Sequence, residues 1–152
     1  MTEETIQRVI AKGFWKNNIC IPNVLMYLDK GYYEADLIMI SKSDYVTEIE
    51  IKLTIMDFMA DFKKKHFHSS PEVRRLYYAF PEKMYKTHAD VIYPQLAELG
   101  IGIITVCLSQ NGLVPKIVLE PCKIRSNKKL TLERKMELLK VGCMKWFMRK
   151  GE

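Results

Sequence analysis

Two neighbouring segments of this sequence alternate apolar with polar or charged residues, and this pattern constrains the fold more than any other. The first segment, YYEADLIMI, covers residues 32–40, and the second, YVTEIEIK, covers residues 45–52. Alternation with a period of two is typical of β-strands, because successive side chains point to opposite faces of a sheet. The polar stretch between the segments predicts a turn. The sequence therefore predicts a β-hairpin that carries several charged side chains.

The charged residues of this hairpin share faces of their strands. Glu48, Glu50 and Lys52 fall on one face of the second strand, and Glu34 and Asp36 share a face of the first. If position 41 pairs with position 45, Asp36 lies opposite Glu50, at a strand separation of about 4.8 Å. A register shifted by one residue would separate them, so the prediction depends on the turn.

These residue types suit metal-assisted hydrolysis of a phosphodiester. Two close carboxylates repel each other unless a cation neutralises them. Their hard oxygen atoms favour Mg²⁺ (or Mn²⁺). Lys52 lies two residues after Glu50 on the same face, where it can orient a water or neutralise phosphate charge. The alternative is a solvated sheet face on which Glu50 and Lys52 form ordinary ion pairs.

The segments before and shortly after this hairpin predict two helices and two more strands. Thr2 can cap a helix whose apolar stripe is Ile6, Val9 and Ile10, and an interrupted strand follows at residues 19–28. Thr54 and Asp57 resemble a capping box for a helix that ends in the run KKKH. The expected apolar positions of that helix are Ile55, Phe58, Met59 and Phe62. Residues 73–80 form the next predicted strand, ending before Pro81.

The second half of the chain continues this alternation. A helix is predicted up to Leu99, with Gly100 placed to end it. Strands are expected at residues 101–108 and, at an edge, 116–120, and a last helix at residues 131–148. The expected buried stripe of this helix is Leu132, Met136, Leu139, Cys143 and Phe147. The 152 residues therefore predict one α/β domain, a sandwich with a mixed central sheet flanked by helices.

At this point the sequence resembles a known group of enzymes. Asp36 followed by Glu50-Ile51-Lys52 is similar to the signature of the PD-(D/E)XK nuclease superfamily. The longer series YEADLIMI, EIEIKLTIMDFMADFKKKH, RRLYYAFPEKM and GIGIITV, within about residues 30–108, is similar to the MmcB-like DNA-repair family of that superfamily. The resemblance implies a restriction-endonuclease-like fold, with Asp36 and Glu50 as metal ligands and Lys52 as the catalytic lysine. Ala35 stands where the signature has proline.

The resemblance leaves the remaining metal ligands open. Glu48 stands where an apolar residue is expected, and is either a further ligand or an exposed neighbour. Superfamily members also use a glutamate on the first helix, for which Glu3 and Glu4 are the candidates. The two histidines after the lysine run, His66 and His68, are interpreted as the polar end of a helix rather than as ligands.

The distribution of charge predicts contact with a polyanion. The net charge is +6, yet residues 123–150 hold ten Lys or Arg and two Glu, a balance of +8. Such an excess attracts a nucleic-acid backbone without reading its sequence, although a solvated basic helix face would look the same. The residues expected to contact DNA are Lys63, Lys64, Lys65, Arg75, Lys128 and Lys129.

The sequence also suggests where the protein acts. It shows no secretory signal and no apolar run of about 18 residues, so no membrane association is expected. The four cysteines form no Cys-x-x-Cys pair and are expected to be reduced and mostly buried. These features predict a cytoplasmic protein, nucleoid-associated or phage-encoded.

We expect a metal-dependent nuclease that hydrolyses DNA phosphodiester bonds in DNA repair or processing. DNA is the expected partner, with a homodimer or a repair-complex protein as a further possibility. Two alternatives have the same fold: a DNA-binding module that does not cut, and a protein-interaction domain whose basic helix binds an acidic partner.

Overall fold

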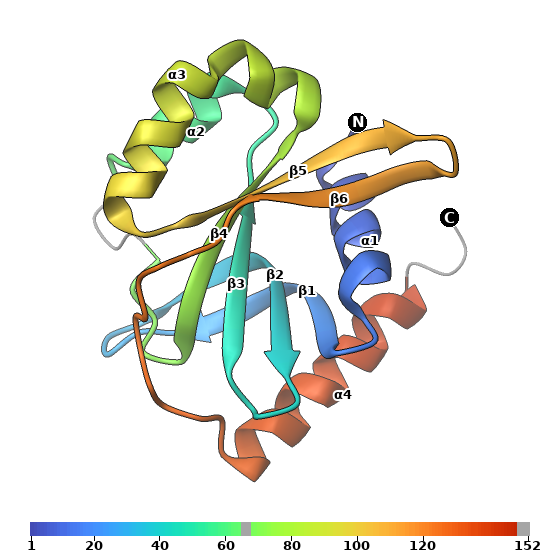
Figure 1. Cartoon of the computed structure of the whole chain (residues 1–152). Coiled ribbons are helices and arrows are strands. Elements are labelled where there is room, and N and C mark those ends of the chain that lie inside the picture. The colour runs from blue at the N-terminus through green and yellow to red at the C-terminus, as the bar shows by residue number, and fades with distance from the viewer. Residues whose placement is uncertain (65–67, 149–152) are drawn as a thin grey trace.

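The computed structural model describes residues 1–64 and 68–148. Its centre is a six-stranded sheet in which the strands follow their order in the chain (Figure 1). The first three strands form an antiparallel meander, β3, β4 and β5 are parallel, and β6 returns antiparallel to β5. The strands are β1 (Asn18–Tyr27), β2 (Tyr32–Ser41), β3 (Val46–Ile51), β4 (Val73–Pro81), β5 (Gly102–Ser109) and β6 (Gly112–Leu119).

Among the described residues, four helices flank this sheet, which confirms the predicted α/β class with a mixed sheet between helices. They are α1 (Glu3–Phe14), α2 (Ile55–Asp61), α3 (Glu82–Leu99) and α4 (Leu132–Met148). The α1 helix packs through Ile6 and Ile10 on one face of the sheet, against Leu37, Ile49 and other residues of the central strands. No helix among the described residues is long and apolar enough to cross a membrane.

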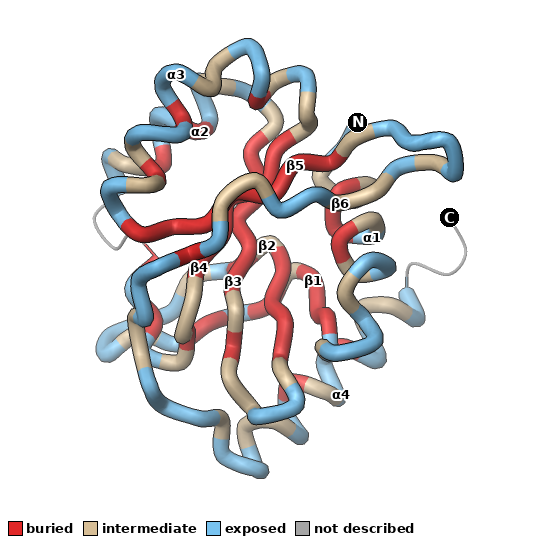
Figure 2. Tube along the Cα trace, viewed as in Figure 1, coloured by how far each residue is buried: buried red, intermediate tan, exposed pale blue. Residues whose placement is uncertain are grey.

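The other face of the sheet carries two separate apolar clusters. Leu138 of α4 packs against β1 and β2 in one of them, and Phe58 of α2 joins β4, β5 and α3 in the other. The inner strands are buried along much of their length, whereas the helices expose their outer sides (Figure 2). On this face the alternate residues Glu48 and Glu50 of β3 are buried but belong to neither cluster. The sheet therefore holds a buried polar region between two apolar ones.

The register of the β2–β3 hairpin agrees with the sequence prediction. Leu37 pairs with Ile49, and Ile38 pairs with Glu48. Continued by one residue, this register sets Asp36 opposite Glu50. The turn is closed by a hydrogen bond from the Ser41 backbone N–H to the Tyr45 carbonyl. The register is therefore the one that the prediction assumed, although the paired residues end at Leu37 and Ile49.

The predicted buried face of α4 is wrong. Leu132, Met136 and Phe147 are 75%, 58% and 67% exposed, and Cys143 is also exposed. The helix packs instead through Leu138 and Gly142. A Cβ at Gly142 would lie 3.0 Å from Cγ1 of Ile21, so the missing side chain lets the helix approach β1 closely. The sequence prediction followed the large apolar residues of the helix and therefore missed the contact at Gly142.

Three smaller predictions also need correction. Met59 is 41% exposed and lies outside the core, whereas Phe58 is fully buried. Only Cys20 is buried among the four free cysteines, with Cys107 half-buried and the other two exposed. The edge strand β6 begins at Gly112, earlier than its predicted start, because a tight turn pairs it with β5 along its whole length.

Candidate active site

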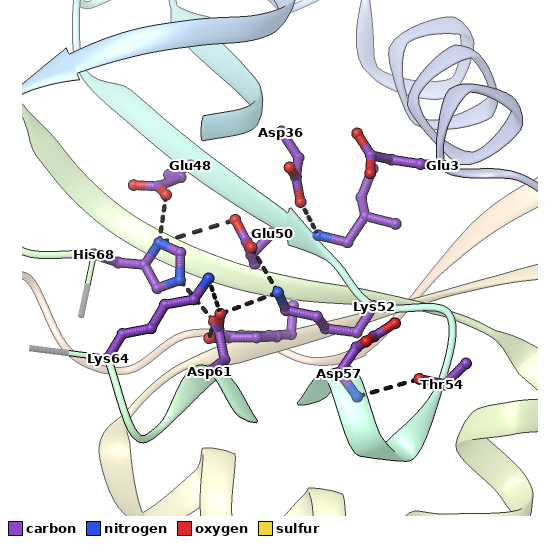
Figure 3. A network of polar contacts seen from close by, with 12 residues as sticks. Glu3, Asp36, Glu48, Glu50, Lys52, Thr54, Asp57, Asp61, Lys64 and His68 are labelled. Carbon is purple, nitrogen blue, oxygen red and sulfur yellow. Dashed lines mark hydrogen bonds and ion pairs between the residues drawn. The ribbon is translucent and has the colours of Figure 1, made fainter. Parts of the chain in front are cut away.

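A pocket of about 450 Å³ opens where β3 ends, between the start of α1 and α2. It brings together the three residues that the sequence singled out, Asp36, Glu50 and Lys52 (Figure 3). Its other charged lining residues are Glu3, Glu34, Asp57, Asp61 and Lys64. The pocket is therefore acidic at its base, with two lysines among the acids.

Asp36 is fixed at the pocket by two backbone contacts. Its Oδ2 accepts a hydrogen bond of 2.7 Å from the Ile51 N–H, which ties β2 to the end of β3. Its carbonyl accepts a hydrogen bond of 2.7 Å from the side chain of Gln7, a buried residue of α1. Burial and then the negative charge of Glu50 raise the pKa of Asp36 to about 8, with a smaller contribution from Glu3. Such a carboxylate gains strongly from a nearby cation.

Glu50 offers one carboxylate oxygen that has no hydrogen bond. Its side chain is 7% exposed, and its Oε1 accepts a hydrogen bond of 2.8 Å from Lys52 Nζ. Its Oε2 is buried and has no hydrogen-bond partner among the described residues. Burial raises the pKa of Glu50, although His68 and Lys52 oppose the shift. The Oε2 atom lies 3.9 Å from His68 Nδ1. A buried carboxylate oxygen without a hydrogen bond fits a divalent cation.

Lys52 is held as a cation between two carboxylates. Its Nζ lies 2.8 Å from Glu50 Oε1 and 3.0 Å from Asp61 Oδ1. Burial alone would lower the pKa of Lys52, but the contacts with Glu50 and Asp61 outweigh it and raise the pKa. The side chain is therefore an ammonium at neutral pH and suits charge stabilisation rather than proton abstraction.

Asp61, which the sequence analysis did not single out, organises the cationic side of the pocket. The residue lies at the end of α2 and is completely buried. Its Oδ1 also lies 2.6 Å from Lys64 Nζ, and its Oδ2 accepts hydrogen bonds from Tyr78 and His68. Burial would raise the pKa of Asp61, but these hydrogen bonds and that from Lys52 hold it well below its usual range. The sequence could have indicated that Asp61 is buried, because it lies three residues after Phe58, an expected core residue, on the same helix face.

The interpretation of His68 as part of a polar helix end is wrong. Its side chain is 6% exposed, with Nδ1 2.7 Å from Glu48 Oε1 and Nε2 2.8 Å from Asp61 Oδ2. Burial would lower the pKa of His68, but the hydrogen bonds to Asp61 and Glu48 raise it to about 9. Glu48 is fully buried and also accepts a hydrogen bond of 2.6 Å from the Tyr33 hydroxyl, so it is not an exposed neighbour.

The structure separates the two candidate glutamates of the first helix. Glu3 lines the pocket, and its Oε1 lies 3.5 Å from the side-chain nitrogen of Asn23 and 3.4 Å from that of Gln7. Glu4 instead forms an ion pair of 2.7 Å with Arg8 on α1. Glu3 is therefore the better candidate for an additional ligand.

The residues expected to contact DNA lie in different places. Lys64 lines the pocket, and Lys63, the preceding residue in the chain, is exposed but does not line it. Lys65, like His66, falls outside the described residues. Tyr78 of β4 pairs with Glu50, so their side chains share one face of the sheet. Arg75 lies three residues before Tyr78 on the same strand, and its side chain therefore belongs to the opposite face from Glu50.

Lys128 and Lys129 lie at the far end of β3 from the pocket. The next residue, Leu130, donates its backbone N–H to the Asp44 carbonyl in the turn before β3. Lys129 Nζ lies 5.5 Å from the centre of the Tyr45 ring, which Arg74 also covers. The six residues of β3 span about 20 Å. The two lysines therefore lie about one strand length away from the pocket.

Comparisons with known proteins support the fold alone. No family model matches the chain, and no curated protein matches its sequence. A solved protein of unknown function from Silicibacter pomeroyi is similar in structure, with a TM-score of 0.59 and 15% identity over 93% of this chain and 84% of that chain. An XisH family protein from Nostoc punctiforme is similar with a TM-score of 0.50 and 14% identity, over 73% of this chain and 96% of that chain.

Proposed function

We propose that the chain is a metal-dependent nuclease that hydrolyses DNA phosphodiester bonds at the pocket of Asp36, Glu50 and Lys52. The observation that carries the proposal is the pocket that Asp36, Glu50 and Lys52 line together, in which burial and the Glu50 charge raise the pKa of Asp36. Two carboxylates of this kind would hold Mg²⁺ or Mn²⁺. The resemblance of Asp36 and Glu50-Ile51-Lys52 to the PD-(D/E)XK signature supports the same assignment.

Each residue of the pocket has a distinct role in this proposal. A bound Mg²⁺ would polarise the scissile phosphate and lower the pKa of its own water. Asp36 and Glu50 supply the ligands, with Glu3 as a further oxygen donor. Lys52 provides a fixed positive charge that stabilises the negative charge developing on the phosphate in the transition state. The ion pair with Asp61 holds its ammonium group in position. Lys64, exposed at the rim, attracts the DNA backbone.

A cleavage assay tests the proposal directly. Wild-type protein should cut supercoiled or single-stranded DNA with Mg²⁺ or Mn²⁺, and chelation should abolish cutting. The double variant Asp36→Asn/Glu50→Gln should lose cleavage while folding normally. Asp57→Asn is the matched control. Asp57 lines the same pocket but is exposed, and among the described residues its one hydrogen bond outside the helix backbone is the helix-capping contact of its backbone N–H with Thr54. Cutting by the double variant at the wild-type rate would refute the proposal.

A second candidate function is that of a protein-interaction module, and one observation favours it. The exposed stripe of α4, formed by Leu132, Met136, Cys143 and Phe147, lies on a helix that also carries Arg134, Lys135, Lys140 and Lys145. Apolar and basic groups together suit an acidic amphipathic partner helix. If Met136→Glu and Phe147→Glu leave DNA cleavage intact, the stripe is separate from the nuclease function. Absence of cleavage on every DNA tried would make this candidate, or a DNA-binding module that does not cut, the better interpretation.

A further inference from the structure

We propose that Glu48, Glu50 and His68 form a second metal site, for a first-row transition-metal dication, behind the pocket that Asp36 lines. The side chains are 0%, 7% and 6% exposed, and one ligand atom from each lies within 4.8 Å of the other two. Within residues 1–64 and 68–148, no other group of His, Cys, Asp and Glu is gathered so closely. The proposal concerns metal binding alone, so it stands or falls independently of DNA cleavage.

The inner atoms of the three side chains are spaced as metal ligands are. His68 Nδ1 lies 2.7 Å from Glu48 Oε1 and 3.9 Å from Glu50 Oε2. Ligand atoms around a tetrahedral ion with bonds of about 2.1 Å lie roughly 3.4 Å apart, so the two distances bracket the expected value. Small rotations of the carboxylates would equalise them.

The outer atoms of the same side chains are each held by a neighbour, and Figure 3 shows the contacts of Glu50 with Lys52 and of His68 with Asp61. The Tyr33 hydroxyl donates to Glu48 Oε2 at 2.6 Å, and Lys52 Nζ donates to Glu50 Oε1 at 2.8 Å. His68 Nε2 lies 2.8 Å from Asp61 Oδ2. Metal-binding histidines and carboxylates in proteins characteristically have such outer partners, which fix the ring and orient the free atom towards the ion.

A buried imidazolium without a metal accounts for only part of this arrangement. A proton on His68 Nδ1 satisfies Glu48 Oε1 at 2.7 Å, but Glu50 Oε2 is 3.9 Å away, beyond hydrogen-bond reach. That oxygen is buried and has no hydrogen bond among the described residues, which is costly for a carboxylate. A divalent ion in place of the Nδ1 proton would contact both carboxylates and the ring nitrogen.

The ligand set selects the kind of metal. Imidazole nitrogen favours ions such as Zn²⁺, Co²⁺ and Cu²⁺, whereas sites made only of oxygen ligands suit Mg²⁺ and Mn²⁺. The pocket side of Glu50 offers carboxylates, from Asp36, Glu3 and Glu34, as possible ligands, and the buried side presents His68. The two sides of Glu50 are therefore expected to bind different ions.

A variant with one histidine gives the cleanest test. The chain has three histidines, so His66→Gln/His88→Gln in a protein without an affinity tag leaves His68 as the sole imidazole. Pulsed electron paramagnetic resonance of this variant with one equivalent of Cu²⁺, which prefers imidazole ligands, should show coupling to one imidazole nitrogen. Asp36→Asn added to this background should keep the coupling. Absence of nitrogen coupling at saturating Cu²⁺ would overturn the proposal, and this readout requires no change within the site.

Affinity measurements complete the test. Visible absorption should follow Co²⁺ binding, and His68→Gln or Glu48→Gln should weaken that binding at least about tenfold. His88→Gln is the matched control and should bind Co²⁺ like the wild type. Mg²⁺ affinity, measured by calorimetry, should be unchanged in Glu48→Gln. Equal Co²⁺ affinity in wild type and in correctly folded His68→Gln, with the fold checked by circular dichroism, would refute the site.

Discussion

Lys52 Nζ lies 3.0 Å from Oδ1 of Asp61, so a carboxylate of α2 holds the lysine that follows β3. The contact joins two segments that are separated by the turn into α2, and both side chains are nearly or completely buried. It gives the pocket a positive group whose position does not depend on substrate. Two consequences can be measured, one for catalysis and one for stability.

Replacing Lys52 should slow cleavage without weakening DNA binding. Because its ammonium is fixed before substrate arrives, we expect it to act on the transition state, and Lys52→Ala should lose a factor of about 10² or more in rate. Single-turnover cleavage at saturating enzyme measures the rate, and a binding titration measures affinity. Lys86→Ala, which removes an exposed lysine of α3 paired with Glu82, is the control. A parallel loss of affinity and rate would mean that Lys52 only neutralises phosphate charge in the ground state.

Replacing Asp61 should destabilise the protein, because several buried donors lose their partner. Asp61→Asn should reduce the free energy of unfolding by about 3 kcal/mol at pH 7, as measured by urea denaturation. Since hydrogen bonds depress the pKa of Asp61 in the folded state, its contribution is present above its unfolded pKa of about 4 and is lost as the pH falls.

The difference in the free energy of unfolding between wild type and Asp61→Asn should therefore become smaller at acidic pH. Asp57→Asn on the same helix changes an exposed carboxylate and should cost less than about 0.5 kcal/mol. Equal effects of the two substitutions would show that the Asp61 network contributes nothing to stability.

Asp36 should make the metal-free protein less stable as the pH rises. Its folded pKa of about 8 lies above the ordinary value of 3.8, so between these values the folded state keeps a proton that the unfolded state releases. Stability should therefore fall as the pH rises from about 4 to about 8. Asp36→Asn should remove this slope and stabilise the metal-free protein by on the order of 1 kcal/mol near pH 8.

Thermal unfolding with and without Mg²⁺ adds a second check on Asp36. Mg²⁺ should stabilise the wild type and have less effect on Asp36→Asn, because binding to the folded state alone raises stability. If calorimetry gives the same Mg²⁺ affinity for both proteins, Asp36 is not a ligand.

The basic segment before α4 should supply affinity for DNA that depends on salt and not on base sequence. Lys128→Gln/Lys129→Gln should reduce the slope of log affinity against log salt by about 0.9 for each duplex phosphate that the variant no longer neutralises. Lys135 is a poorer choice for this test, because its Nζ lies 2.6 Å from Asp44 Oδ1. Lys86→Gln again serves as control. An unchanged slope in the double variant would mean that these lysines do not contact DNA phosphates and instead face solvent or a protein partner.

The sequence by itself determined the hairpin and the residues that it carries. The alternation in residues 32–52 fixes which side chains share a face, and a short turn fixes the register, so Asp36, Glu50 and Lys52 could be predicted to meet. Both are properties of neighbouring residues in the chain, and local geometry is enough to decide them.

Only the tertiary structure decided what completes the site and how the last helix packs. Asp61 and His68 reach Glu48 and Lys52 because the segment after β3 folds back over the sheet, which no local period encodes. The buried face of α4 was likewise decided by the absence of a side chain at Gly142, which permits close contact with Ile21. Burial and packing depend on the shape of a surface formed by residues distant in sequence, and that shape exists only once the chain has folded.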